Sequence, residues 1–327
     1  MATKLFTSRL DLLQALESSL NEFETRILAM YNSRVSGIIK DPLLMNIAID
    51  DHMVHRGHAV FDTVSVINGR AYNLRRHLRR IENSASLARI PLPYSIPEIE
   101  TIILDLAACT NDQNLFIRYW ISAGPGSMAI YPNPNSSTFY AIAYHSDAFI
   151  KFGNKSDCFV SVPTKPKILA NIKSNNYLLN ALCCMESLEK GGSSGIQLCP
   201  NGDIAEGSIN NVAFVLPGKV FVTPKYDFIL NGTTIERVLI FAEKLVQEGL
   251  LNRIEQRDLT VEEVLQCEEA MKVGGDSVSG LLKLDDMVIN NGLEGEVSKR
   301  LKEMLKADFS NPELCIPIPY ERYIQTS

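Results

Sequence analysis

Hydrophobic side chains near the N-terminus recur at intervals of three and four residues, which is the spacing of an amphipathic helix. They are Leu10, Leu13, Leu16, Leu20, Phe23 and Ile27. The pattern predicts a helix over this stretch, and we expect its apolar face to pack against the core.

Alternating and β-branched residues follow this helix and predict a group of strands. Strands are expected at residues 34–39, 60–68, 70–73, 115–123 and 138–144, and helices at residues 74–88 and 97–109. Asn68-Gly69 separates two of these strands and predicts a hairpin turn. The pattern is interrupted between residues 146 and 155. We therefore predict a domain boundary there, with residues 1–148 in a smaller N-terminal domain and residues 149–327 in a larger C-terminal one.

The second half of the chain continues as a mixture of short strands and helices. Strands are expected at residues 156–163, 196–199, 214–216, 219–223, 252–256, 269–273 and 279–284, and helices at residues 175–190, 233–247 and 295–305. This is a mixed α+β pattern without repeats. Residues 312–327 contain three prolines and no periodicity, so we expect an extended tail over the surface.

Composition narrows the class of protein. A chain of 327 residues is long for a single core, so two domains are expected. A net charge of −6 argues against nucleic acid as a partner. No apolar run approaches the ~20 residues that span a bilayer. The seven cysteines are odd in number and lack a CxxC motif, which is typical of reduced thiols in an intracellular protein. We expect a cytoplasmic location and leave an organellar one open.

One lysine and one glutamate stand out as candidate chemistry. Lys173 precedes a predicted helix, and Glu206 lies where a predicted strand passes into a loop. A lysine that forms a Schiff base must be partly desolvated, so that its amine is neutral near pH 7. Pyridoxal phosphate also needs a carboxylate that faces its ring nitrogen and keeps it protonated. The pair fits this cofactor, although a chain of this length contains many such pairs.

The surrounding motifs make the pair specific. They are NIKSNNY at residues 171–177, DIAEG at 203–207, DHMVHRGHAVFDT at 51–63 and RYWISAGPG at 118–126. Through them the chain resembles, over residues 30–284, the class IV (fold-type IV) pyridoxal phosphate enzymes. That family includes D-amino acid aminotransferases, branched-chain aminotransferases and 4-amino-4-deoxychorismate lyase. The resemblance is strongest to the plant D-amino acid transaminase-like branch.

The resemblance implies a fold and an assembly. The expected fold is the two-domain α+β architecture of fold-type IV, with pyridoxal phosphate held mainly by the larger C-terminal domain. Members of the family are homodimers or are built from dimers, so we expect a homodimer.

The resemblance also implies roles for individual residues. Lys173 is the Schiff-base lysine that moves the substrate proton, and Glu206 pairs with the pyridine nitrogen. Asn211 supports the cofactor. Tyr177 matches a tyrosine of branched-chain aminotransferases that faces the phenolic oxygen of the cofactor, while a tyrosine packed in the core is the alternative.

Phosphate recognition is expected at a helix N-terminus, because backbone N–H groups and hydroxyls converge there. Gly232 opens the predicted helix at 233–247, and Thr233 and Thr234 fall in its first turn; an ordinary N-cap is the alternative. The resemblance adds Arg80 as a phosphate ligand. It also places Gly275 where the family usually has threonine or serine, so the backbone N–H remains but a hydroxyl is lost.

A second departure concerns the substrate. Bacterial D-amino acid aminotransferases bind the substrate carboxylate through an arginine at the position of Ala123. Arg118 is a candidate replacement, on the opposite strand face from Tyr119. Phe61 and His58 are expected to line the substrate pocket. The histidines at 52, 55 and 58 lack the companions of a metal site, so no metal is expected.

The leading hypothesis is therefore a pyridoxal phosphate-dependent transaminase that converts D-amino acids to 2-oxo acids with an oxo-acid acceptor. 4-Amino-4-deoxychorismate lyase uses the same lysine and glutamate and is the alternative enzyme. A cofactor-binding homologue with weak activity is the third hypothesis, because of Ala123 and Gly275.

Overall fold

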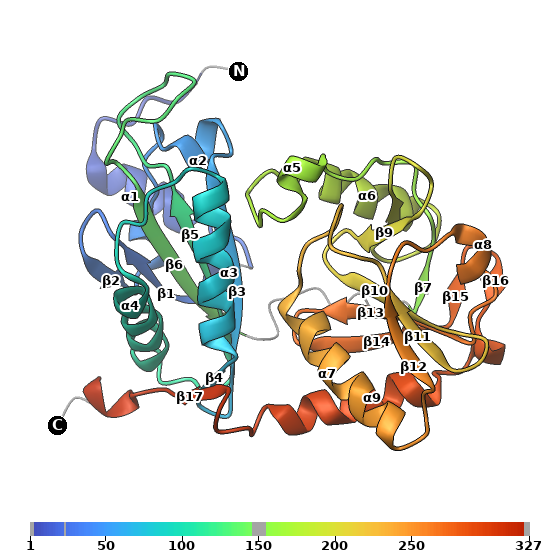
Figure 1. The fold of residues 1–327 in the computed structure, drawn as a ribbon. Coiled ribbons are helices and arrows are strands. Elements are labelled where there is room, and N and C mark those ends of the chain that lie inside the picture. Colours follow the sequence, from blue (N-terminus) through green and yellow to red (C-terminus); the bar gives the residue numbers. More distant parts are fainter. Residues whose placement is uncertain (1–2, 23, 146–154, 324–327) are drawn as a thin grey trace. The chain divides into compact units, whose positions relative to one another are not determined.

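The structure is a computed structural model that describes residues 3–22, 24–145 and 155–323. The chain forms two compact units (Figure 1). Unit 1 comprises Met1–Ile150 and Cys315–Ser327, and unit 2 comprises Lys151–Leu314. The boundary that we predict between residues 148 and 149 lies outside the described residues. The C-terminal segment, which we assigned to the second domain, belongs to unit 1.

Unit 1 is built on a seven-stranded sheet with the order β17-β4-β3-β5-β6-β1-β2. Its strands are β1 (Ile27–Asn32), β2 (Gly37–Ile39), β3 (Ala59–Ile67), β4 (Arg70–Tyr72), β5 (Leu115–Ser122), β6 (Thr138–His145) and β17 (Cys315–Pro317). Every neighbouring pair is antiparallel. The turn between β3 and β4 has positive φ at Asn68 and Gly69, as the hairpin prediction requires.

The main helices of unit 1 cover one face of this sheet. They are α3 (Leu74–Leu87), which contacts β3, and α4 (Ile96–Ala108), which contacts β6, β1 and β5 (Figure 1). Shorter elements are α1 (Arg9–Glu17), α2 (His52–His55) and the 3-10 turns Glu24–Arg26, Pro42–Leu44 and Tyr320–Arg322. Alternate residues of β5 point to opposite faces: Tyr119 is buried, whereas Arg118 and Trp120 are partly exposed.

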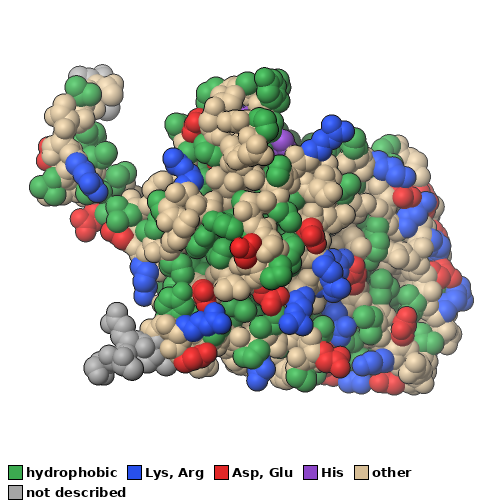
Figure 2. All heavy atoms as spheres, turned by 60° about the vertical axis from the view of Figure 1, so that its left-hand side comes forward, with side chains coloured by type: hydrophobic (Ala, Val, Ile, Leu, Met, Phe, Trp, Pro, Cys, Tyr) green, Lys and Arg blue, Asp and Glu red, His purple; other side chains and the backbone are tan. Residues whose placement is uncertain are grey.

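Two predictions about the chain ends are confirmed only in part. The N-terminal helix forms at Arg9–Glu17, but it ends there, none of its residues is buried, and Ile27 begins β1 instead of a helical turn. Figure 2 shows hydrophobic side chains on the outside of this N-terminal arm. The tail is also more than a surface strap, because Cys315–Pro317 pairs with β4. An uncovered edge strand offers unpaired backbone groups, and the tail supplies their partners.

Unit 2 contains a five-stranded sheet with the order β12-β11-β10-β13-β14, a three-stranded sheet with the order β16-β15-β7, and the hairpin of β8 and β9. The five-stranded sheet consists of β10 (Asn211–Leu216), β11 (Val220–Thr223), β12 (Arg253–Gln256), β13 (Glu269–Gly274) and β14 (Ser277–Leu281). The short strands are β7 (Ser156–Asp157), β8 (Ile196–Leu198), β9 (Ile204–Gly207), β15 (Lys283–Leu284) and β16 (Met287–Val288). The strand predicted at 156–163 is thus reduced to two residues.

The helices of unit 2 are α5 (Lys167–Ala170), α6 (Leu178–Glu189), α7 (Thr233–Gln247), α8 (Val261–Val264) and α9 (Glu296–Asp308), with a 3-10 turn at Asn290–Gly292. The bounds of α7 coincide with the prediction. Its buried face includes Val238, Phe241 and Leu245, and it contacts α9, β12 and β13. This packing fixes the N-terminus of α7 beside the end of β13.

Candidate active site

Lys173 and Tyr177 lie together in the segment that joins α5 to α6. The Lys173 Nζ donates a hydrogen bond to the Tyr177 hydroxyl over 3.2 Å. We expected a helix to begin between them, but α6 begins at Leu178 and Tyr177 is its N-cap. The loop, not a helical turn, therefore brings the two side chains together. Both are partly buried, as a lysine nucleophile and its hydrogen-bond partner require.

Glu206 lies on β9, and its hydrogen bonds only partly replace the hydration that its carboxylate loses on burial. Its Oε2 accepts a hydrogen bond from the backbone N–H of Leu230 at 3.1 Å and a weaker one from the Asn211 amide at 3.5 Å. Burial raises the pKa of Glu206 to about 7, although the Leu230 N–H and the charges of Lys165 and Lys173 oppose the rise. A carboxylate in this state favours a further cationic partner.

Asn211 ties the Glu206 strand to the start of α7. Its amide donates to the Leu230 carbonyl at 2.9 Å. A Cβ on Gly232, the N-cap of α7, would lie 2.1 Å from the Asn211 Oδ1, so this approach requires glycine. The contact holds Glu206 and the N-terminus of α7 in one neighbourhood.

The predicted phosphate-binding residues of unit 2 also converge there. Thr233 and Thr234 are buried in the first turn of α7, where backbone N–H groups lack helical partners. The Thr234 hydroxyl accepts a hydrogen bond from the backbone N–H of Asp276 at 3.2 Å. Gly275 and Asp276 have φ values of +57° and +54° and connect β13 to β14, which is the pattern of a type I′ turn. Gly275 thus lies next to the residue whose N–H reaches Thr234.

These residues fit pyridoxal phosphate by the chemistry of their donor set. The helix terminus, two hydroxyls and a glycine turn suit a phosphate. Glu206 suits a protonated ring nitrogen, because the donors that reach its Oε2, the Leu230 N–H and the more distant Asn211 amide, are both uncharged. Lys173, beside the Tyr177 hydroxyl, suits the aldehyde carbon. All of these groups belong to unit 2.

Arg80, the fourth predicted phosphate ligand, lies in unit 1 within a buried ion pair. Its Nε and one Nη donate to the two oxygens of Asp62 at 2.8 Å and 2.6 Å, and His77 Nδ1 lies 3.0 Å from the same carboxylate. Burial alone would raise the pKa of Asp62, but Arg80 and His77 hold it far below its usual range. The phosphate role of Arg80 stays a prediction. Our sequence analysis missed Asp62; its signal was a carboxylate at an inward-facing position of a strand.

The residues predicted to contact substrate also lie in unit 1. The Arg118 Nε donates to the Thr63 hydroxyl at 3.0 Å, and its guanidinium lies 5.5 Å from the centre of the Phe61 ring. His58 contacts the Ala88 carbonyl through Nε2 at 2.9 Å. Ala123 is buried. The structure brings Arg118 and Phe61 together, and the substrate roles of Arg118, Phe61 and His58 stay predictions.

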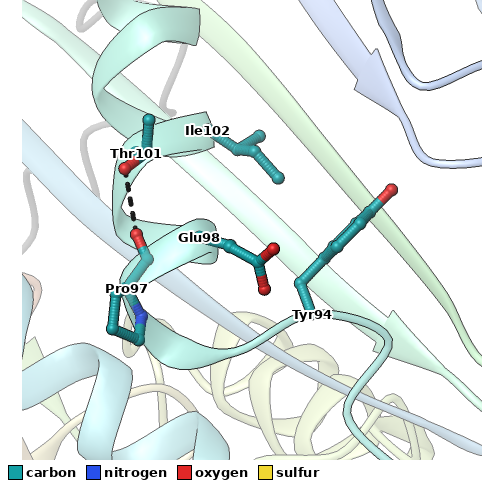
Figure 3. A pocket seen from close by; sticks show the side chains of 5 residues that line it. All are labelled: Tyr94, Pro97, Glu98, Thr101 and Ile102. Carbon is teal, nitrogen blue, oxygen red and sulfur yellow. Dashed lines mark hydrogen bonds between the residues drawn. The ribbon is translucent and has the colours of Figure 1, made fainter.

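Two further features concern ligands. In the described part of the chain, no group of three histidine, cysteine or carboxylate side chains is arranged to hold a metal ion, and no helix is long and apolar enough to cross a bilayer. Unit 1 carries a pocket of about 390 Å³ that is lined by Tyr94, Pro97, Glu98, Thr101 and Ile102 (Figure 3). These residues lie on α4 and just before it, and none of them is a predicted site residue.

Comparisons with known proteins identify the family of the chain. The profile of the family described as "Amino-transferase class IV" matches residues 59–279. The chain is 41% identical over 300 residues to "D-amino-acid transaminase, chloroplastic" of Arabidopsis thaliana, which covers 90% of this chain and 80% of that protein. It is 26% identical over 276 residues to a "Putative branched-chain-amino-acid aminotransferase" of Methanocaldococcus jannaschii, covering 83% of this chain and 94% of that protein.

Solved structures share the fold. The branched-chain aminotransferase of the thermophilic archaeon Thermoproteus uzoniensis, with norvaline, has a TM-score of 0.79 at 20% identity, over 89% of this chain and 99% of that one. The matches do not support the lyase alternative. The chain belongs to the class IV aminotransferase family and is a pyridoxal phosphate-dependent transaminase with the α+β, fold-type IV architecture.

Proposed function

We propose that this enzyme transfers the amino group of D-amino acids to 2-oxo acids. The observation that carries the proposal is the 41% identity to the Arabidopsis D-amino-acid transaminase over 90% of this chain. The branched-chain relatives are 26% identical or less, so they support the family more than the substrate.

When bound, pyridoxal phosphate supplies an electron sink for the substrate Cα. The Lys173 amine removes the Cα proton and returns it, and the Tyr177 hydroxyl, 3.2 Å away, orients that amine. Glu206 keeps its negative charge against the ring nitrogen, and Asn211 holds Glu206 next to α7. Thr233, Thr234 and Gly275 bind the phosphate, and Arg80 remains its predicted cationic ligand.

A second candidate is transamination of branched-chain L-amino acids. Tyr177 favours it, because the resemblance gives branched-chain aminotransferases a tyrosine at this position, and several relatives carry that printed name.

A panel of D- and L-amino acids with 2-oxoglutarate or pyruvate as acceptor decides between the two. We expect D-amino acids to bleach the visible absorbance of the loaded protein stoichiometrically, and the oxo acid to restore it. Turnover of L-leucine, L-isoleucine and L-valine without a response to D-amino acids would transfer the assignment to the second candidate.

We also propose that the enzyme is a homodimer. The helix α6 carries an exposed apolar stripe at helical spacing, formed by Leu178, Leu182, Met185 and Leu188, which are 71%, 40%, 56% and 52% exposed. Contiguous exposed apolar side chains mark association surfaces. Light scattering should give about twice the chain mass of 36.4 kDa for the wild type. Met185→Glu should halve this mass, whereas Val288→Glu, at a position of similar exposure on β16, should not.

For the location, we keep the cytoplasmic proposal that the cysteine pattern favours. The printed name of the Arabidopsis relative places that protein in the chloroplast. A fluorescent protein fused to the C-terminus of this chain distinguishes the two compartments.

A further inference from the structure

A second lysine lies against the same tyrosine as Lys173. The Lys165 Nζ is 4.4 Å from the centre of the Tyr177 ring, and the Lys173 Nζ is 5.8 Å from the same centre. The two ammonium groups cannot lie further apart than the sum of these two distances. That upper limit is comparable with the Debye length of about 8–10 Å. The two charges therefore interact through a ring and a protein surface that water screens only in part.

The local sequence explains why Lys165 stays there. Pro166 follows it, has a φ of −53° and precedes α5, and a residue before proline is held in an extended conformation. Lys165 is itself partly buried. Because the backbone of Lys165 has few accessible conformations, its side chain loses less freedom when it makes the cation–π contact with Tyr177.

Neighbouring lysines are neutralised, whereas Lys165 is not. Lys167 pairs with Asp227 at 3.2 Å, and Lys225 pairs with Asp227 at 3.2 Å and Asp258 at 2.7 Å. Within the described residues no ion pair involves Lys165. The charge of Lys165 acts on Glu206. It lowers the pKa of Glu206 more than the charge of Lys173 does.

We propose that Lys165 is a positioning residue of the active site, whose charge makes the Lys173 amine a weaker proton acceptor and keeps Glu206 ionised. The proposal rests on the proposed role of Lys173 as the lysine that joins the cofactor. A nearby cation disfavours the protonated amine and favours the carboxylate, so one side chain pushes both groups toward the states that the reaction needs.

Charged and titratable groups around Lys165 and Lys173 include Tyr177 and Glu206, and a separate ion-paired cluster is formed by Lys167, Lys225, Asp227 and Asp258. Removal of the Lys165 charge takes away a repulsion on Lys173, while the attraction between Glu206 and Lys173 remains. Protonation of the nitrogen that joins Lys173 to the cofactor then becomes easier, and its pKa should rise.

The test is a pH titration of the visible absorbance of the loaded, full-length protein. Lys165→Met keeps the length of the side chain but removes the charge, and it should raise the midpoint by about 0.3–1 pH unit. Lys165→Arg keeps the charge and should leave the midpoint at the wild-type value. Lys167→Met makes the same change of charge at a lysine that is already paired, and should also leave the midpoint unchanged.

Loss of pyridoxal phosphate on dialysis is a second readout. Lys165→Met should lose the cofactor several-fold faster than the wild type, because a less ionised Glu206 holds the ring nitrogen less well. An unchanged midpoint in Lys165→Met would overturn the proposal, and so would an equal shift in Lys165→Met and Lys165→Arg, which would indicate a packing role. Failure of the underlying role is distinguishable, since Lys173→Ala would then retain the visible band.

Discussion

Asp62 in unit 1 is fully buried and Glu206 in unit 2 is partly buried, and their surroundings shift the pKa values of the two carboxylates in opposite directions. Asp62 receives two hydrogen bonds from Arg80 and a contact from His77, and its pKa lies far below the usual range. Glu206 receives one backbone N–H and a long amide contact, and burial raises its pKa to about 7.

The difference separates a carboxylate that is paired within its own unit from one that can accept a further cationic partner. A buried charge is stable when its partners replace the lost hydration. Asp62 has those partners within its own unit, so it fixes α3 on β3 whatever the protein binds. Glu206 is only partly compensated, so it gains most when a cation arrives. The protonated ring nitrogen of the cofactor is such a cation.

The largest expected effect comes from substitution of Lys173. Lys173→Ala removes the proposed covalent anchor and proton carrier together, so transamination should fall by more than about 10⁴-fold. The visible absorbance of the loaded protein should also disappear. Spectra and turnover of Lys167→Ala provide the control, and wild-type turnover in Lys173→Ala would remove this residue from the mechanism.

The two carboxylates can be compared directly by mutation. Asp62→Ala removes the carboxylate that compensates the buried charge of Arg80 and should lower the free energy of unfolding by about 3–5 kcal/mol. Glu206→Gln should cost little stability, yet reduce turnover by about 10²–10³-fold, because a neutral amide no longer stabilises the ring charge. Urea unfolding and steady-state kinetics measure the two effects. Wild-type stability of the Asp62→Ala variant, or wild-type turnover of the Glu206→Gln variant, would contradict the distinction between the two carboxylates.

The stability of the cofactor-free protein should depend on pH because the pKa of Glu206 is raised. The folded pKa of Glu206, about 7, lies above the ordinary value of 4.5. The folded state therefore binds the proton more tightly than the unfolded state. The contribution of Glu206 to stability is present below about pH 4.5 and falls as the pH rises to about 7, by roughly 1–3 kcal/mol. Thermal unfolding of Glu206→Gln, measured at both pH values, should lack this component.

The smallest effect is expected at the glycine turn. Gly275 has a φ of +57° and no atom within 4 Å of a Cβ built on it. Threonine there meets backbone strain of about 1–2 kcal/mol instead of a clash. Gly275→Thr should therefore speed cofactor loss on dialysis roughly tenfold, despite its added hydroxyl. Gly275→Asn, which tolerates a positive φ, should behave like the wild type. Slower loss in the threonine variant would show that the hydroxyl outweighs the strain.

The sequence predicted those features of the fold that depend on interactions between residues close together in the chain. Helix α7 begins at Thr233 as predicted, because Gly232 and the two threonines mark its start. The turn at Asn68-Gly69 follows from the positive φ that those residues accept. Lys173 and Glu206 were identified because family motifs surround them.

Pairings between distant segments could not be predicted in the same way. Asp62 contacts Arg80 only because α3 packs on β3. The strands β4 and β17 pair although they are separated by most of the sequence. Nothing in the sequence singles out Lys165, and its contact with Tyr177 depends on the course of the loop between them. In each case the sequence contains the residue, while the partner depends on how the chain returns on itself.

Because β17 follows unit 2 in the chain, the sheet of unit 1 stays incomplete until all of unit 2 has been synthesised. The whole of unit 2, Lys151–Leu314, is made between β6 and β17. At about 5–20 residues per second this interval lasts roughly 10–30 s, during which β4 has an open edge. An open edge is a site of wrong pairing between nascent chains. A message cut short before the codon for Cys315 would yield a product that has every predicted cofactor ligand but lacks the strand that closes this edge.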